Sequence, residues 1–203
     1  MGFFFADKGE KMSEIIEKGM YFAKEEFFQL IRDLGGTWDD VKQRPVVTLI
    51  QSKQNPEIYW AIPLGNYNHR DARGKERIRS FLDSPEHQIR SCYYHVGKTD
   101  KKSIFNVSQV VPVTKKYIDR EYTYAGNHLQ IVLKNKNLVK ELERKVSRIL
   151  AYERDFMKKN GKSRFQQGIT KIFDHLQAEL AAEAYSKEIA IAELKTDSLE
   201  SSA

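Results

Sequence analysis

The sequence predicts an α+β fold, in which a small antiparallel sheet is flanked by helices and the C-terminal part is helical. Two β-branched, apolar runs at residues 45–50 and 58–64 are joined by a short polar turn, which is typical of an antiparallel hairpin. Apolar side chains recur at helical spacing after residue 135. Strands and helices do not alternate in βαβ units, so a doubly wound parallel sheet is not expected.

Four helices are expected, at residues 23–34, 75–82, 136–152 and 165–180. Gly35 and Gly36 follow the first helix and are expected to end it, because glycine favours helix ends. The second helix, at residues 75–82, is rich in basic residues. In the third, Leu138, Leu142 and Val146 recur along one side, which indicates packing against a core.

The middle of the chain is expected to add two strands and a short helix. Residues 90–96 and 103–113 are rich in β-branched and aromatic side chains, which favours strands. Pro112 has no N–H, so the later strand is expected at an edge or an end of the sheet. Residues 113–122 are expected to start a short helix that Thr114 could cap.

One domain is expected, from residue 20 to residue 176. A chain of 203 residues is long enough for one hydrophobic core but short for two. Residues 1–19 are interpreted as an N-terminal leader. Residues 177–203 are interpreted as an acidic tail rich in Ala and Glu, and residues 198–203 are expected to be disordered.

The chain is basic, with a formal net charge of +6 and a pI of about 9.2. This surplus favours polyanionic partners, which basic side chains bind through phosphate contacts. Cys92 is the single cysteine, so no internal disulfide can form, which favours a reducing, cytoplasmic location. No apolar run approaches the roughly 20 residues that cross a bilayer, so no membrane association is expected.

Signatures of common nucleotide-dependent and metal-dependent enzymes are missing from the sequence. There is no Walker loop, no GxGxxG after a strand, no HExxH and no GxSxG. The acidic residues do not cluster as a two-metal site requires. We therefore expect neither a metal nor another cofactor, which leaves acid–base chemistry without a metal.

Residues 65–103 are the chemically richest stretch of the chain. Lysines and arginines are mixed there with three tyrosines and three histidines, namely Tyr67, Tyr93, Tyr94, His69, His87 and His95. Cations that meet phosphates and aromatic rings that stack on bases suit single-stranded RNA. Part of the basic run alternates with acidic residues and is interpreted as a solvated helix face.

Cleavage of RNA without a metal needs a base for the ribose 2′-OH, an acid for the leaving 5′-oxygen and cations for the charge on the phosphate. Histidine suits the first two roles because its pKa lies near neutrality. His95 follows an aromatic run and precedes a glycine-containing turn, and His69 lies in a polar loop after the second strand. These two histidines are therefore the candidates for proton transfer.

Seven blocks of the chain together resemble the TenpN family of type III toxins. They are YWAIPLGNYNHR (residues 59–70), KERI (75–78), IRSCYYHVG (89–97), KSIF (102–105), VVPVTKKYI (110–118), LERK (142–145) and SRIL (147–150). The blocks are fairly specific as a set, and the resemblance covers residues 20–176. The family is more distantly similar to the toxins ToxN and AbiQ.

The resemblance implies both a fold and a function. The related toxins are metal-independent endoribonucleases on a twisted antiparallel sheet flanked by helices, similar to the MazF and Kid barrel. A repeated pseudoknot RNA, which they cut from its own precursor, inhibits them. By implication this protein binds such an RNA antitoxin in a closed toxin–RNA hetero-oligomer, and cuts cellular or phage RNA when it is freed.

The sequence departs from the distant relatives at the catalytic position. Those toxins carry Thr-Ser and Lys after an Ala-Pro-Leu strand end, whereas GNYNHR stands here, without a hydroxyl pair. Only the location of the site is therefore carried over. The catalytic candidates are His69, His95, Lys75 and Ser103, and the RNA-binding candidates are Asn66, Tyr67, Arg70, Arg73, Arg77, Tyr94, Lys98 and Lys102.

Two other functions stay open at this point. The same basic and aromatic segment would serve a non-catalytic RNA-binding module equally well. An interaction protein that works through its helical C-terminal half would explain the long apolar stripes, but it leaves residues 65–103 without a role.

Overall fold

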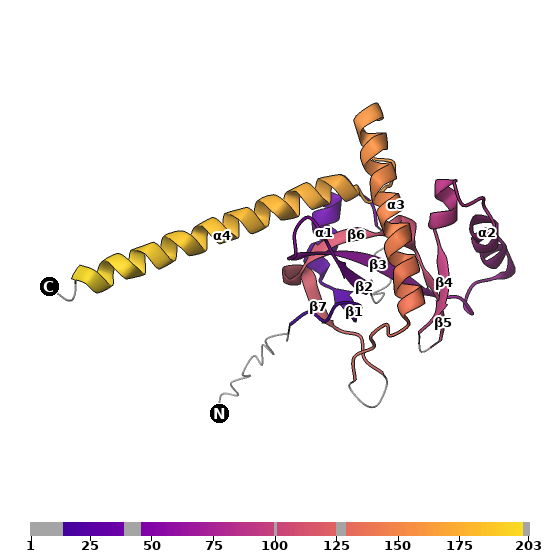
Figure 1. Cartoon of the computed structure of the whole chain (residues 1–203), viewed down its shortest axis with the longest axis horizontal. Helices are drawn as coiled ribbons and strands as arrows, with labels where there is room; N and C mark the ends of the chain where they lie inside the picture. Colours follow the sequence, from indigo (N-terminus) through magenta and orange to yellow (C-terminus); the bar gives the residue numbers. More distant parts are fainter. Residues whose placement is uncertain (1–13, 39–45, 100, 125–128, 201–203) are drawn as a thin grey trace, which may run out of the picture.

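The computed structural model describes residues 14–38, 46–99, 101–124 and 129–200. Within them, seven strands form one curled antiparallel sheet, a half-barrel in the order β4-β5-β3-β2-β1-β7, with β6 paired to β3 (Figure 1). The strands are β1 Met20–Ala23, β2 Val46–Gln51, β3 Ile58–Asn66, β4 His95–Lys98, β5 Lys102–Phe105, β6 Val111–Thr114 and β7 Ile118–Glu121. The expected α+β class, with an antiparallel sheet and C-terminal helices, is confirmed.

The described residues also form four α-helices, α1 Glu25–Asp33, α2 Ala72–Leu82, α3 Lys136–Asn160 and α4 Ile169–Glu200. In Figure 1, α3 runs across the sheet, α2 lies on the outer side of β4 and β5, and α4 extends away from the sheet. The side-chain oxygen of Asn135 accepts hydrogen bonds from the N–H groups of Asn137 and Leu138 and caps α3. Gly161 ends α3 in the left-handed region, with φ 65°, which favours glycine.

The helix α4 does not stop where the composition changes at Gln177. It continues to Glu200. Residues 201–203, and residues 1–13 of the expected leader, lie outside the described residues. Alanine and glutamate are strong helix formers, which explains the continuation.

The central strand β3 positions the candidate site. One edge of β3 pairs with β2, with Val47 opposite Ile62, and this pairing confirms the expected hairpin. The other edge pairs with β6 through residues 58–61 and with β5 through residues 64–66. Between these two stretches Pro63 has no N–H to donate, and its carbonyl accepts a hydrogen bond from the N–H of Asn106.

The single strand predicted at residues 103–113 is instead two strands, β5 and β6. A 3-10 turn, Val107–Gln109, separates them where the ladder is interrupted beside Pro63. Pro112 lies in β6, which pairs with β3 alone among the described strands. The edge position expected for this proline is therefore confirmed.

The strand predicted at residues 90–96 is wrong over most of its length. Ile89–Cys92 is a 3-10 turn, and β4 begins only at His95. The ammonium group of Lys145 on α3 donates hydrogen bonds to the carbonyl oxygens of Ser91 (3.0 Å) and Tyr94 (2.8 Å). A side chain thus takes the carbonyl groups that a neighbouring strand would have bound.

The short helix predicted at residues 113–122 is also wrong. Lys115–Tyr117 makes one 3-10 turn, and Ile118–Glu121 forms β7, which pairs with β1. The side chain of Thr114 makes no capping hydrogen bond. Valine, isoleucine and tyrosine have weak helix propensity, so pairing with β1 prevails over local helix formation.

The main core lies where α1, α3 and α4 pack on the sheet. The ring of Trp60 in β3 stacks on Phe173 of α4 with a centroid distance of 5.3 Å. Phe27 of α1, and Leu142 and Ile149 of α3, are fully buried. In the part of the chain that the structure describes, no helix combines the length and the apolar character that crossing a membrane requires.

Candidate functional site

Most of the candidate residues lie on the end of β3, the β4–β5 hairpin and α2. The register places His95 opposite Phe105, and Lys98 opposite Lys102. Successive side chains of a strand point to opposite faces, so His95 lies on one face of the hairpin while Lys98 and Lys102 lie on the other. The face that carries His95 is named the α3 face, because a Cβ built on Gly97, on the same face, would lie 3.0 Å from Leu138 of α3. The face that carries Lys98 and Lys102 is named the α2 face.

Tyr67 is the centre of the α2 face. The ammonium nitrogen of Lys102 lies 4.2 Å from the centroid of its ring, and that of Lys75 on α2 lies 5.8 Å away. The N–H of Tyr67 donates to the carbonyl of Lys102 and thereby extends the β3–β5 ladder. A partly exposed ring with two ammonium groups near it can stack on a base through a free face while the ammonium groups contact phosphates.

Further predicted residues surround this ring. The guanidinium of Arg70 lies over Gly65, where a Cβ would come within 3.3 Å of it. His69 is exposed in the turn between β3 and α2. Three other expected cations are exposed on α2 or at the end of β4, namely Arg73, Arg77 and Lys98. His69 therefore lies two positions after Tyr67 in an exposed turn, and the predicted cations Arg73, Arg77 and Lys98 are open to solvent.

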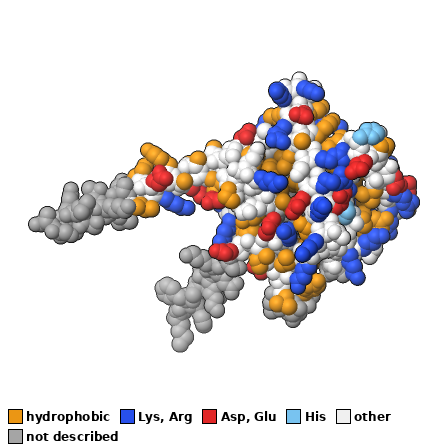
Figure 2. Space-filling view, viewed as in Figure 1, with side chains coloured by type: hydrophobic (Ala, Val, Ile, Leu, Met, Phe, Trp, Pro, Cys, Tyr) orange, Lys and Arg blue, Asp and Glu red, His pale blue; other side chains and the backbone are white. Residues whose placement is uncertain are grey.

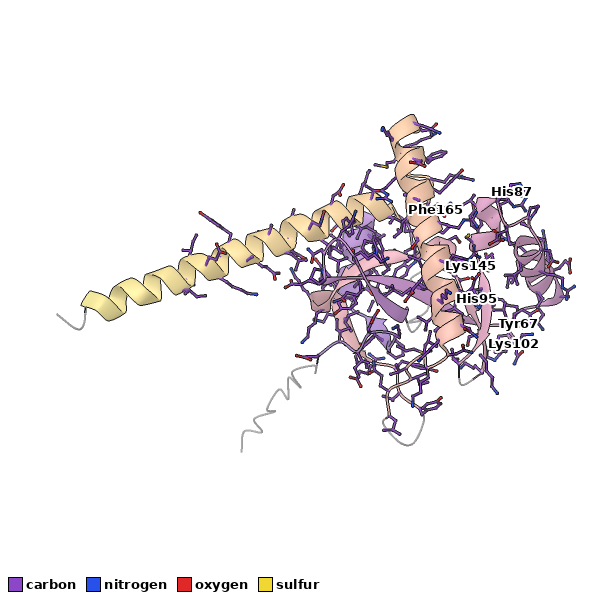
Figure 3. All side chains as sticks on the ribbon, viewed as in Figure 1. Tyr67, His87, His95, Lys102, Lys145 and Phe165 are labelled. Carbon is purple, nitrogen blue, oxygen red and sulfur yellow. The ribbon has the colours of Figure 1, made fainter. Side chains whose placement is uncertain are left out.

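His95 lies on the α3 face, half-buried, with its ring centroid 6.2 Å from that of Phe105. Burial lowers the pKa of His95, and the ammonium of Lys145 lowers it further, against the opposing effect of Glu141. Figure 3 shows His95 next to Lys145 at α3, and Tyr67 and Lys102 together at a different place. His95 therefore favours its neutral form and is separated from the cations of the α2 face.

Lys145 is the residue that the sequence analysis missed. It is only 5% exposed, and besides its two carbonyl partners its ammonium lies 3.9 Å from a carboxylate oxygen of Glu141. Burial lowers the pKa of Lys145. Hydrogen bonds from Arg144 at 2.7 and 2.9 Å hold Glu141 and lower the pKa of that carboxyl group. A signal was available, because position 145 falls within the apolar stripe of α3, where a lysine is unexpected.

Three predicted residues make contacts that shape the hairpin. Ser103 is buried, with its hydroxyl 2.9 Å from that of Thr99. Asn66 pairs with Ser103 across β3 and β5, and its side chain accepts a hydrogen bond from the N–H of Asn68. Tyr94 is half-buried, with its ring 5.5 Å from that of Phe81 on α2. These contacts give each of the three a structural role.

Basic side chains gather on the part of the surface that carries α2, β4, β5 and α3, on the right of Figure 2, with acidic side chains among them. Residues 65–103 contain nine lysines and arginines against five acidic residues, so they carry +4 of the net charge of +6. Among the described residues, no three His, Cys, Asp or Glu side chains lie close enough to hold a metal ion. The charge of this region suits a polyanion.

Comparison of the chain with models of known protein families and with curated proteins finds no match.

Proposed function

We propose that this protein is a metal-independent, sequence-selective endoribonuclease, the toxin of a type III toxin–antitoxin system, and that it binds single-stranded RNA across the α2 face. The observation that carries the proposal is the ring of Tyr67 with the ammonium groups of Lys102 and Lys75 at 4.2 and 5.8 Å. Stacking on a ring and charge pairing with lysines together bind single strands without reading their sequence.

The chemistry would be attack of the ribose 2′-oxygen on the adjacent phosphorus. The bond from phosphorus to the 5′-oxygen breaks, leaving a 2′,3′-cyclic phosphate and a 5′-hydroxyl. His69 is exposed in the turn between β3 and α2, two positions after Tyr67, so it is the stronger candidate for proton transfer. Lys75, Lys102 and Arg70 would stabilise the charge on the phosphate oxygens.

The assignment to a type III toxin–antitoxin system rests on the resemblance to TenpN toxins and is part of the proposal. The curled antiparallel sheet with its flanking helices is consistent with a barrel like that of MazF and Kid. The partner would be a repeated pseudoknot RNA that inhibits the toxin in a closed hetero-oligomer in the cytoplasm. Cellular or phage RNA would be the target of the free toxin, in phage defence by abortive infection.

A non-catalytic RNA-binding module is the second candidate. One observation favours it: His95, the histidine with the lowered pKa, lies on the α3 face, away from Tyr67 and the lysines. Two histidines on different faces cannot serve one phosphate as acid and base. The α2 face would then bind RNA without cutting it.

The deciding experiment uses the full chain with a mixed single-stranded RNA in EDTA, beside the variants His69→Gln and His95→Gln. Cutting by the parent and by His95→Gln, but not by His69→Gln, with cyclic-phosphate ends on the products, is the expected result. Loss of cutting in His95→Gln alone would move the chemistry to the α3 face. RNA binding by the parent without cutting would replace the proposal by the binding module.

A further inference from the structure

A second contact between a cation and an aromatic ring lies at the other end of α2. The guanidinium carbon of Arg90, in the 3-10 turn before β4, lies 5.0 Å from the ring centroid of Phe81. The Phe81 ring packs against Tyr93 and Tyr94 at centroid distances of 5.4 and 5.5 Å. Arg90 is exposed, whereas the three rings are half-buried. The three packed rings therefore support an arginine that is exposed to solvent.

This contact and the Tyr67 site are connected through α2. Lys75, which contacts Tyr67, and Phe81 are six positions apart on α2, a rise of about 9 Å along the helix axis. Both are spaced three positions from Ile78, the buried residue of α2, so they lie on the side of the helix that meets the rest of the protein. Lys75 and Phe81 are only half-buried, so a strand of RNA that follows the edge where α2 meets the protein can reach both places.

We propose that Arg90 and Phe81 form a second stacking site for RNA, so that α2 guides a single strand between a base at Tyr67 and a base at Arg90. An RNA base would stack on the solvent-exposed face of the Arg90 guanidinium, whose other face lies over the ring of Phe81. This names the substrate class as unpaired RNA, since the bases of a duplex have no free faces for stacking. The inference rests on the RNA binding of the proposed function, and not on cleavage.

Substitutions at position 90 separate stacking from charge. Arg90→Lys keeps the positive charge but removes the planar group, and Arg90→Gln removes both. Phe81→Leu removes the supporting ring. The matched control is Arg79, an exposed arginine of α2 that is paired with Glu76 at 3.0 Å, changed to Lys and to Gln.

The measurement is the fluorescence anisotropy of labelled oligouridylates of two to ten nucleotides, with 2′-O-methyl groups that block the nucleophile of cleavage. For the long oligonucleotides we expect Arg90→Lys and Arg90→Gln to lose about tenfold or more in affinity. The shortest ones, which reach only Tyr67, should bind as to the parent. The Arg79 variants should stay within about threefold of the parent at every length.

The outcomes distinguish the inference from the proposed function. Parent-like binding of long oligonucleotides by Arg90→Lys would show that only charge acts at position 90, which overturns the stacking site and leaves RNA binding intact. No binding of any oligonucleotide by the parent would overturn both. Thermal unfolding of Phe81→Leu shows whether its fold is kept, and if it is not, the two Arg90 variants decide alone.

Discussion

His95 and Lys102 lie on opposite faces of the same β-hairpin. His95 pairs with Phe105, whereas Lys102 pairs with Lys98, three residues further along β4. Because His95 and Lys98 are an odd number of residues apart on one strand, their side chains point to opposite faces. The imidazole therefore faces α3, and Lys98 and Lys102 lie on the α2 face. In the sequence these residues are seven positions apart and look like members of one site. The structure divides them, and leaves His69, exposed in the turn two positions after Tyr67, as the other candidate histidine.

Replacing Tyr67 by leucine tests the stacking role of its ring. We expect Tyr67→Leu to weaken the binding of single-stranded RNA by about tenfold, because one stacked base contributes roughly 1–3 kcal/mol. Equilibrium binding at fixed salt measures the effect. Tyr185→Leu is the control, since Tyr185 is 66% exposed on the distant part of α4. Equal binding by the two variants would contradict a role for Tyr67.

Lys102→Gln tests the phosphate contact. A cation that neutralises one phosphate of a single strand contributes about 0.7 to the slope of log affinity against log salt. We expect that slope to fall by about this amount in Lys102→Gln. The exposed Lys171 on α4 is the control position, where glutamine should leave the slope unchanged. An unchanged slope in Lys102→Gln would place the phosphates elsewhere.

Lys145→Met tests the buried ammonium. Its loss leaves the carbonyl groups of Ser91 and Tyr94 without a donor, which we expect to lower the free energy of unfolding by about 2–4 kcal/mol. Lys140→Met, at an exposed position of α3, should change that free energy by less than about 0.5 kcal/mol. Urea unfolding measures both. A stability of Lys145→Met equal to the parent's would show that apolar packing replaces these hydrogen bonds.

The stability should depend on pH through His95. Burial, and then Lys145, lower the pKa of His95 in the folded state, whereas in the unfolded state it titrates near 6.5. As the pH falls from about 6.5 towards the folded-state value, the unfolded chain binds a proton that the folded protein does not, so stability falls. His95→Gln should reduce this fall between pH 7.5 and 5.5.

Melting temperatures across that range provide the test, with His87→Gln as the control for an exposed histidine. Glu141 has a lowered pKa, so its contribution is lost only near and below about pH 4.5, outside this range. A melting curve of His95→Gln with the same pH dependence as the parent would contradict the prediction.

Glu153 ties the end of α3 to the segment that precedes α4. Glu153 is 1% exposed, and its carboxylate accepts hydrogen bonds from the hydroxyl of Ser163 and, at 3.0 Å, from the N–H of Arg164. We expect Glu153→Ala to lower the free energy of unfolding by about 1–3 kcal/mol, because the N–H of Arg164 loses its partner, whereas the hydroxyl of Ser163 keeps the carbonyl of Phe165 as an acceptor. Asp155→Ala, two positions further at an exposed site, should have little effect in the same denaturation experiment.

The helices α1 and α3 and the β2–β3 hairpin could be predicted from the sequence because each has a local pattern. The stripe of Leu138, Leu142 and Val146 has the helical period, and the two apolar runs are joined by a short turn. The segment before His95 could not be predicted in this way. Its aromatic residues favour a strand. Lys145, 51 positions away from Tyr94 in the chain, instead donates a hydrogen bond to the carbonyl of Tyr94, and the segment forms a turn.

The amino-acid sequence by itself determined the α+β class, the main helix stripes and the concentration of positive charge and aromatic rings in residues 65–103. Those properties depend on the spacing of apolar residues along the chain and on composition, and both can be read from short stretches of sequence. The tertiary structure alone decided which face each site residue occupies, because a register change of one residue moves a side chain to the other face. It also decided the burial of Lys145, since only the packing of α3 on the turn before β4 brings its ammonium to the carbonyl groups of Ser91 and Tyr94.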